Sequence, residues 1–275
     1  MNIKSTHSAT KLLWLTDLHL DRTDDETRGR FLSKIEGLRY DSVIITGDIS
    51  TASHLSDHLR EIAEACSPRP VYFVLGNHDF HHSSIAQVDE LVESTCHQQR
   101  NLHHLGTGEI IRLNPDTALV GHRGWADGRA GMGQRTVIES RDKNSIADLR
   151  NLTKDELFDR MNQYGRESAA YFRSVLPYAL ECYRNVLVAT HVPPFTQAAH
   201  YNGQRCAPTH LPHFANYSTG CALLGLSRGF PRRMITVLCG HTHTSRRTRI
   251  LENLEVRVGG AQSGRPAVQG IIEFD

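Results

Sequence analysis

Five short blocks of the sequence contain side chains that bind divalent metal ions. In chain order they are Asp17-Leu18-His19, Gly47-Asp48, Gly76-Asn77-His78-Asp79, Thr190-His191 and Gly240-His241-Thr242-His243. The candidate ligands are two carboxylates, one amide oxygen and four imidazoles, namely Asp17, Asp48, Asn77, His19, His191, His241 and His243. Seven such ligands are too many for one tetrahedral ion, but they suit two divalent ions that share a bridging carboxylate. Because paired ions about 3.5–4 Å apart promote in-line displacement at phosphorus, the blocks predict hydrolysis of phosphoesters.

Each block directly follows a short apolar run that is typical of a strand buried on both faces. These runs cover residues 12–16, 42–46, 71–75, 185–189 and 235–239, and a further one covers 118–120. Ligands of open α/β sheets gather beyond the carboxyl ends of the strands, so we expect the five blocks to face one crevice. The glycine before Asp48, Asn77 and His241 allows a sharp exit from the strand and a close approach of the backbone.

Amphipathic helices separate the first strands. Apolar residues recur at helical spacing over 31–38, 55–66 and 85–92, and about 30 residues separate Asp17 from Asp48 and Asp48 from Asn77. This alternation predicts an α/β sheet with helices on its faces. The tail alternates apolar and polar residues over 254–258 and 270–274, which predicts strands with one solvated face.

Two stretches interrupt this alternation within what we interpret as one domain, residues 1–275. We interpret Gly121 to Tyr183 as a helical insertion or lid, in which Thr153 and Glu156 form a capping box at the start of a helix. Residues 194–231 are rich in glycine, proline, histidine and asparagine, and predict a long loop near the site with a short helix over 221–226. We expect seven of the histidines outside the five blocks to be solvated: His81, His82, His103, His104, His200, His210 and His213.

The order of the blocks, D-x-H, G-D, G-N-H-D, H and G-H-x-H, resembles the signature of the calcineurin-like metallophosphoesterase superfamily. The resemblance spans nearly the whole chain, from Asp17 to His243. It implies a four-layer α/β/β/α sandwich with a dinuclear metal site at the strand ends. It also implies which residue serves which ion: Asp17, His19 and His243 the first, Asn77, His191 and His241 the second, and Asp48 as the bridge between them.

Three further residues have expected roles at the site. The resemblance implies that His78 contacts a phosphoryl oxygen and protonates the leaving group, and that Asn77 also contacts the substrate. We expect Asp79 to orient His78 by accepting its other N–H. Arg123 lies in a glycine-rich cationic stretch, where it would either clamp a second phosphate oxygen or sit on the surface of a turn; both interpretations stay open.

The first expected function is a phosphodiesterase in which a metal-activated hydroxide attacks phosphorus in line, with small-molecule or nucleotide diesters as substrates. The alternative is a phosphomonoesterase or phosphoprotein phosphatase, for which Arg123 would neutralise the dianion. A binding scaffold that has lost catalysis would show degenerate ligands, whereas all seven candidate ligands are present here. A structural zinc site would rely on cysteine, and none of the candidate ligands is a cysteine. Manganese is the first expectation for the two ions, and iron, zinc, magnesium and nickel fit the same oxygen and nitrogen ligands.

Composition excludes other classes of protein. The 275 residues carry 31 Lys+Arg against 30 Asp+Glu, a balance that argues against a binder of duplex nucleic acid or of anionic membranes. No apolar run approaches the roughly 20 residues that cross a bilayer, and Met1 to Lys11 lacks the apolar core of a secretory signal. Six irregularly spaced cysteines indicate reduced thiols and a cytoplasmic location. The sequence does not fix an oligomeric state.

Overall fold

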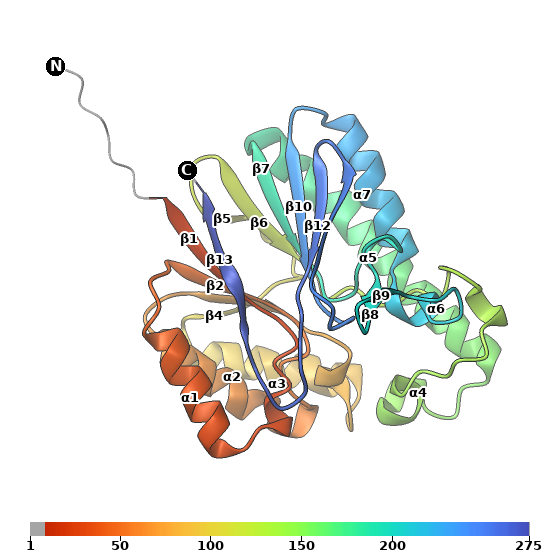
Figure 1. The fold of residues 1–275 in the computed structure, drawn as a ribbon, viewed down its shortest axis with the longest axis horizontal. Helices are drawn as coiled ribbons and strands as arrows, with labels where there is room; N and C mark the ends of the chain where they lie inside the picture. The colour runs from red at the N-terminus through yellow and green to blue at the C-terminus, as the bar shows by residue number, and fades with distance from the viewer. Residues whose placement is uncertain (1–8, 275) are drawn as a thin grey trace.

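Two β-sheets packed face to face form the centre of the computed structural model, which describes residues 9–274 (Figure 1). The interpretation of Met1 to Lys11 as lacking a signal therefore falls mostly outside the described residues. The first sheet has the order β13 (Val268–Phe274), β1 (Thr10–Leu15), β2 (Ser42–Thr46), β3 (Val71–Val74) and β4 (Leu102–His104). The second has the order β11 (Arg246–Leu251), β12 (Leu254–Val258), β10 (Met234–Cys239), β7 (Asn185–Ala189), β6 (Thr117–Gly121) and β5 (Ile111–Arg112).

Both sheets are parallel in their interior; the first is antiparallel at one edge and the second at both edges. Strands β1 to β4 pair in parallel, as do β6, β7, β10 and β12, whereas β13, β5 and β11 pair antiparallel with their neighbours. The parallel strands of one sheet therefore all deliver their carboxyl ends to the same edge, which is where the predicted ligands follow.

In each sheet, alternating side chains of a strand point to two different cores, one between the sheets and one under the outer helices. In β1, Leu13 and Leu15 pack against the helices outside the first sheet, while Leu12 and Trp14 pack between the sheets, where they meet Leu187 of the second sheet and its neighbours. The outer helices of this sheet are α1 (Asp25–Glu36), α2 (Ala52–Cys66) and α3 (Ile85–Gln98), in agreement with the helical spacings of the sequence.

The second sheet is covered by α5 (Lys154–Cys182) and α7 (Tyr217–Gly229), so the expected four-layer sandwich is confirmed. Phe172 and Leu176 of α5 pack with Val186 and Val237 of the sheet and with Leu223 of α7. Because α5 connects the adjacent parallel strands β6 and β7, it is the crossover helix of this sheet.

The predicted insertion over Gly121 to Tyr183 is therefore too long. Its capping box at Thr153 and Glu156 is present, but the helix that it starts belongs to the core. The part that leaves the α/β alternation is residues 122–152, hereafter segment 122–152, which contains short helical turns including α4 (Asp142–Ser145).

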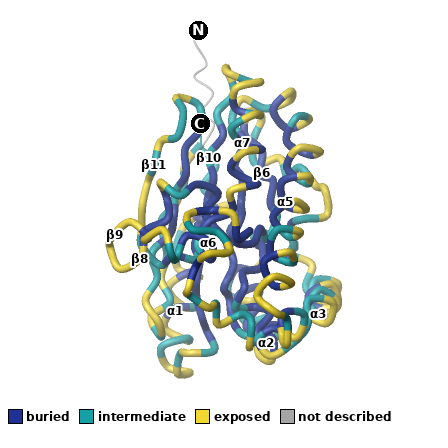
Figure 2. Tube along the Cα trace, turned by 90° about the vertical axis from the view of Figure 1, so that its right-hand side faces the viewer, coloured by how far each residue is buried: buried dark blue, intermediate teal, exposed yellow. Residues whose placement is uncertain are grey.

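Residues 194–231 also contain more structure than the sequence suggests. They form the hairpin of β8 (His200–Tyr201) and β9 (Gln204–Arg205), the short helix α6 (Leu211–Phe214) and α7, which is capped by Asn216 and begins well before the expected 221–226 helix. Figure 2 shows the exposed hairpin beside α6 and the buried strands behind it. The expectation of solvated histidines is wrong for His81, His200 and His213, which are buried.

Within residues 9–274, no helix is both long and apolar enough to cross a membrane.

The assignment of α5 to the core predicts a large loss of stability in Phe172→Ala. This fully buried ring lies between helix and sheet, so its removal should cost roughly 3–5 kcal/mol in the free energy of unfolding, measured by urea denaturation. Tyr178→Ala is the matched control on the same helix, since this ring is 66% exposed and its loss should change stability by about 0.5 kcal/mol or less. Equal, small effects of both variants would instead favour a lid that is separate from the core.

Candidate metal centre

Loops that leave five strands bring all seven predicted ligands into one cluster. Asp17 and His19 follow β1, Asp48 follows β2, Asn77 follows β3, His191 follows β7, and His241 and His243 follow β10. Each of these side chains lies within hydrogen-bond or ion-pair distance of another member. The structure thus brings the five blocks together at one place, as the strand order predicted.

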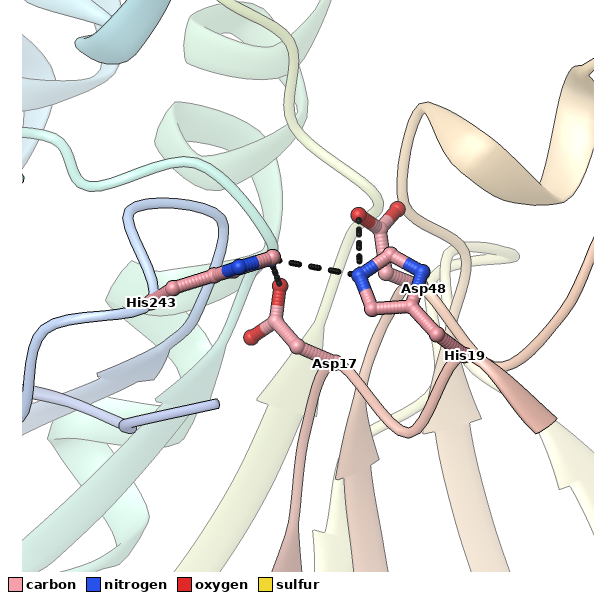
Figure 3. A group of neighbouring side chains, drawn as sticks. All are labelled: Asp17, His19, Asp48 and His243. Atoms are coloured by element: carbon pink, nitrogen blue, oxygen red, sulfur yellow. Dashed lines mark hydrogen bonds and ion pairs between the residues drawn. The ribbon is translucent and has the colours of Figure 1, made fainter. Parts of the chain in front are cut away.

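The first half of the cluster consists of Asp17, His19, Asp48 and His243, whose potential ligand atoms all lie within 4.8 Å of one another (Figure 3). The Nε2 atoms of His19 and His243 are 3.2 Å apart, and His243 Nε2 lies 3.3 Å from Asp17 Oδ1. Asp48 Oδ2 lies 3.7 Å from His19 Nε2. Two imidazole nitrogens and two carboxylates thus point into the same small volume.

The second half of the cluster consists of Asn77, His191 and His241, which lie on the side of the other Asp48 oxygen. Asp48 Oδ1 lies 3.2 Å from His191 Nε2, which in turn lies 3.2 Å from Asn77 Oδ1. Asn77 Oδ1 lies 3.0 Å from His241 Nδ1. Asp48 therefore offers one oxygen to each half, which is one of the geometries by which a carboxylate can bridge two cations.

Hydrogen bonds on the outside of the cluster determine which atoms face inward. His191 Nδ1–H donates to the carbonyl of Thr46 at 2.8 Å, and His241 Nε2–H donates to the carbonyl of His213 at 2.8 Å. When each ring is neutral, these bonds leave its inner nitrogen with a free lone pair. Asn77 donates its Nδ2–H to Asp142, so its carbonyl oxygen also faces inward. A donor set of inward lone pairs fits divalent cations.

The ligands occupy a strained backbone at the strand ends. Asp17, His19, Asp48, His241 and His243 all have positive φ angles, between 42° and 70°. Non-glycine residues seldom adopt this left-handed conformation, and such strain clusters at functional sites. All three predicted glycine contacts are present, because a Cβ on Gly47 would overlap His191 Nδ1, one on Gly76 would overlap Asp48 Oδ1, and one on Gly240 would overlap Asp17 Oδ2.

The electrostatics of the cluster favour positive charge at its centre. Burial acts to raise the pKa of Asp48, but His191, His78 and His19 hold it well below its usual range. Burial likewise acts to lower the pKa of His191, and the neighbouring Asp48 carboxylate overcomes this and raises it to about 10. His19 has its pKa lowered to about 4, mainly by burial. Burial also acts to raise the pKa of Asp17, but the bond from His243 helps to hold it below its usual value, so Asp17 and Asp48 are both ionised at neutral pH and stabilise cations between them.

The expected role of Asp79 is wrong. Its carboxylate accepts four backbone N–H bonds: from Asp48 and Gly76 through Oδ2, at 3.0 and 2.7 Å, and from Ile49 and Ser50 through Oδ1, at 2.8 and 2.9 Å. The side chain therefore ties the loop after β2 to the loop after β3 and does not orient His78. Burial and the charge of Asp48 raise the pKa of Asp79 to about 7.

His78 lies beside the cluster on the helical turn η2 (His78–Phe80). Its backbone N–H donates to Asp48 Oδ1 at 2.9 Å, and its ring lies edge-on to that of His19 with centroids 4.7 Å apart. Arg22, on the turn η1 (Leu20–Arg22), donates to His78 Nδ1 at 3.0 Å. Because arginine only donates, the proton of the neutral ring is on Nε2. Burial lowers the pKa of His78 to about 4, which favours this neutral form.

Arg123 is not brought to the cluster by its side chain. The guanidinium donates to both oxygens of Asp89 on α3, at 2.9 and 3.2 Å, and lies over the ring of Phe80. Only its backbone carbonyl reaches the site, where it accepts the N–H of His191. Of the two interpretations left open, this geometry supports the structural one.

Sequence reasoning missed three residues around the cluster: Arg22, His81 and Asp142. Arg22 follows the first block closely, but nothing in its spacing distinguishes it from a surface arginine. His81 donates its Nε2–H to Asp142 at 2.8 Å, and its ring centroid is 4.2 Å from that of His78. Asp142 lies in segment 122–152, which has no periodic pattern that would have placed it here.

A family model and several solved structures are similar to this chain. The family model described as calcineurin-like phosphoesterase matches residues 10–245. A dimetal phosphatase of Danio rerio is similar in structure, with a TM-score of 0.56, 14% identity, and coverage of 91% of this chain and 87% of that one. A protein of Thermus thermophilus has a TM-score of 0.52 and 12% identity, with coverage of 92% of this chain and 90% of that one. No curated protein is significantly similar in sequence.

The four bonds to Asp79 predict that Asp79→Asn destabilises the fold. The amide keeps one acceptor oxygen and places its NH₂ against two backbone N–H groups, so unfolding should become easier by roughly 2–4 kcal/mol in urea denaturation. Asp89→Asn is the control, since it weakens only a partly exposed ion pair and should cost about 1 kcal/mol or less. Unchanged stability of Asp79→Asn would show that the carboxylate does not hold these loops.

Proposed function

Because the chain belongs to the calcineurin-like phosphoesterase family, we propose that it is a phosphodiesterase that hydrolyses small-molecule or nucleotide diesters with two divalent ions bound at the cluster. The observation that carries this proposal is the convergence of six candidate metal ligands around Asp48, whose two oxygens face different sets of them. The family implies a dinuclear metal centre, and the first half of the cluster has the spacing of a metal site.

We assign Asp17, His19 and His243 to the first ion and Asn77, His191 and His241 to the second, with Asp48 between them. The inward atoms and the two halves of the cluster support this division. Manganese is the first candidate for both positions, because the donors are oxygen and nitrogen atoms only; iron, zinc, magnesium and nickel accept the same set. Paired divalent ions, when bound, lower the pKa of water and neutralise the charge of phosphoryl oxygens.

The residues of the chain orient the substrate next to this centre. His78 presents Nε2–H and is held by Arg22 at one end and by the backbone bond to Asp48 at the other. This N–H serves as the hydrogen-bond donor to a phosphoryl or leaving-group oxygen. The Arg22 side chain is 35% exposed, and its guanidinium can also contact the phosphate.

Two structural features bear on the substrate class. Segment 122–152 and α6 both lie beside the second half of the cluster. Asp142 of the segment bonds to Asn77, and the ring centroid of Phe214 in α6 lies 5.2 Å from that of His241. They provide surfaces for the second ester arm of a diester. A phosphomonoesterase, including a phosphoprotein phosphatase, is the second candidate, because Arg22 supplies a cation for a dianion. The near-neutral net charge favours small substrates over duplex nucleic acid.

A cytoplasmic location is part of the same proposal. All six cysteines are free, which fits a reducing compartment.

The proposed two-ion centre predicts that chelation abolishes hydrolysis and that manganese restores it. A bis-aryl and a mono-aryl phosphate with the same leaving group should then be compared on the manganese-loaded protein, and a higher kcat/KM for the bis-aryl ester is expected. A higher value for the mono-aryl ester would replace the diesterase by the second candidate. Hydrolysis that survives complete metal removal would contradict both.

The position of His78 predicts that His78→Ala slows turnover by about 10²–10⁴-fold while both ions remain bound. The loss should grow as the pKa of the leaving alcohol rises, because poor leaving groups depend most on a donated hydrogen bond. A series of aryl and alkyl esters, with metal content measured in parallel, tests this. An equal loss for all leaving groups would exclude His78 as the donor to the leaving oxygen.

A further inference from the structure

Asp142 is the carboxylate through which segment 122–152 reaches the cluster. One oxygen, Oδ1, accepts both Asn77 Nδ2–H at 2.9 Å and His81 Nε2–H at 2.8 Å. The side chain is only 15% exposed. Asp142 is thus a hydrogen-bond acceptor directly behind a ligand of the second half.

The bond to Asp142 decides which end of the Asn77 amide faces inward. An asparagine side chain has one acceptor end and one donor end, and only the oxygen can bind a cation. A 180° rotation of the amide would point the NH₂ at the centre and the oxygen at the Asp142 carboxylate. The repulsion between these two oxygens disfavours that orientation. Asp142 therefore keeps Asn77 Oδ1 toward His191 and His241.

Segment 122–152 supports a second ligand of the same half. The carbonyl of Ile138 accepts His213 Nε2–H at 3.0 Å, and the carbonyl of His213 accepts His241 Nε2–H at 2.8 Å. Among the described residues, Asp17, His19 and His243 have no hydrogen bond to this segment. Its contacts are therefore confined to the side of the cluster that we assign to the second ion.

The segment is anchored well enough to act as a support. The N–H groups of His82 and Ile85 donate to the Ser145 carbonyl and to Asp148, at 2.7 and 2.8 Å. Ile146 and Leu149 are fully buried in the core beneath the first sheet. Asp142 is thereby fixed relative to the loop that carries Asn77.

We propose that Asp142 is a positioning residue for the second metal ion, and that segment 122–152 thereby determines the occupancy of the second position without affecting the first. This inference rests on the two-ion centre of the proposed function. Asp142 does not contact the ions and acts through the orientation of Asn77.

Manganese titration of the metal-free protein by isothermal calorimetry tests this inference. The wild type should bind two ions. Asp142→Ala should bind the second ion about 10–100-fold more weakly, which is the usual effect of removing an outer hydrogen-bond partner, and the first ion as the wild type does. Asp142→Asn should retain much of the second affinity, because its amide oxygen can accept both bonds. Electron paramagnetic resonance should show loss of the coupled manganese pair in Asp142→Ala alone.

Asp148→Ala is the matched control, since it removes a carboxylate from the same segment that bonds to Ile85 rather than to Asn77. It should retain both ions. Two outcomes overturn the inference alone: unchanged binding of the second ion by Asp142→Ala, or equal weakening by Asp148→Ala. A wild type that binds a single ion would overturn the proposed two-ion function and this inference together.

Discussion

The geometry of the candidate metal centre depends on the orientation of one buried carboxylate, that of Asp48. Its oxygens face two separate sets of donors, 3.7 Å from His19 on one side and 3.2 Å from His191 on the other. Its backbone is held in the left-handed region, its own N–H is bonded to Asp79, and Gly76 leaves no room for a side chain beside it. Each of these constraints comes from the loop after β2 or the loop after β3. A carboxylate fixed in this way can be shared by two cations without having to reorganise.

The sandwich provides the rigidity that such a site needs. Strained, charged groups are stable in a buried site only when the surrounding structure determines their positions, and here the apolar strands on both sides do so. The core between the sheets and the two cores under the helices fix five strand ends relative to one another. The family of the chain and the similarity in fold to a dimetal phosphatase accord with this arrangement.

The parts of the structure that sequence could predict have local signals. Strands and the first three helices have short-range apolar periodicity, and each ligand follows a strand directly, so sheet topology alone brings the ligands together. The outer partners have no such signal. Whether Asp79 faces His78 or four backbone N–H groups, and whether Asp142 reaches Asn77, depends on the path of loops whose sequences are not periodic. The sequence suggested Arg123 as the cation of the site, but its guanidinium pairs with Asp89, and Arg22 is the arginine that lies beside His78.

Anomalous diffraction from crystals reconstituted with manganese tests the central claim most directly. A shared Asp48 carboxylate predicts two peaks about 3.5–4 Å apart, with one oxygen of Asp48 toward each. His19 and His243 should lie around one peak, and Asn77 and His241 around the other. A single peak, or two peaks with Asp48 bound to only one of them, would contradict it.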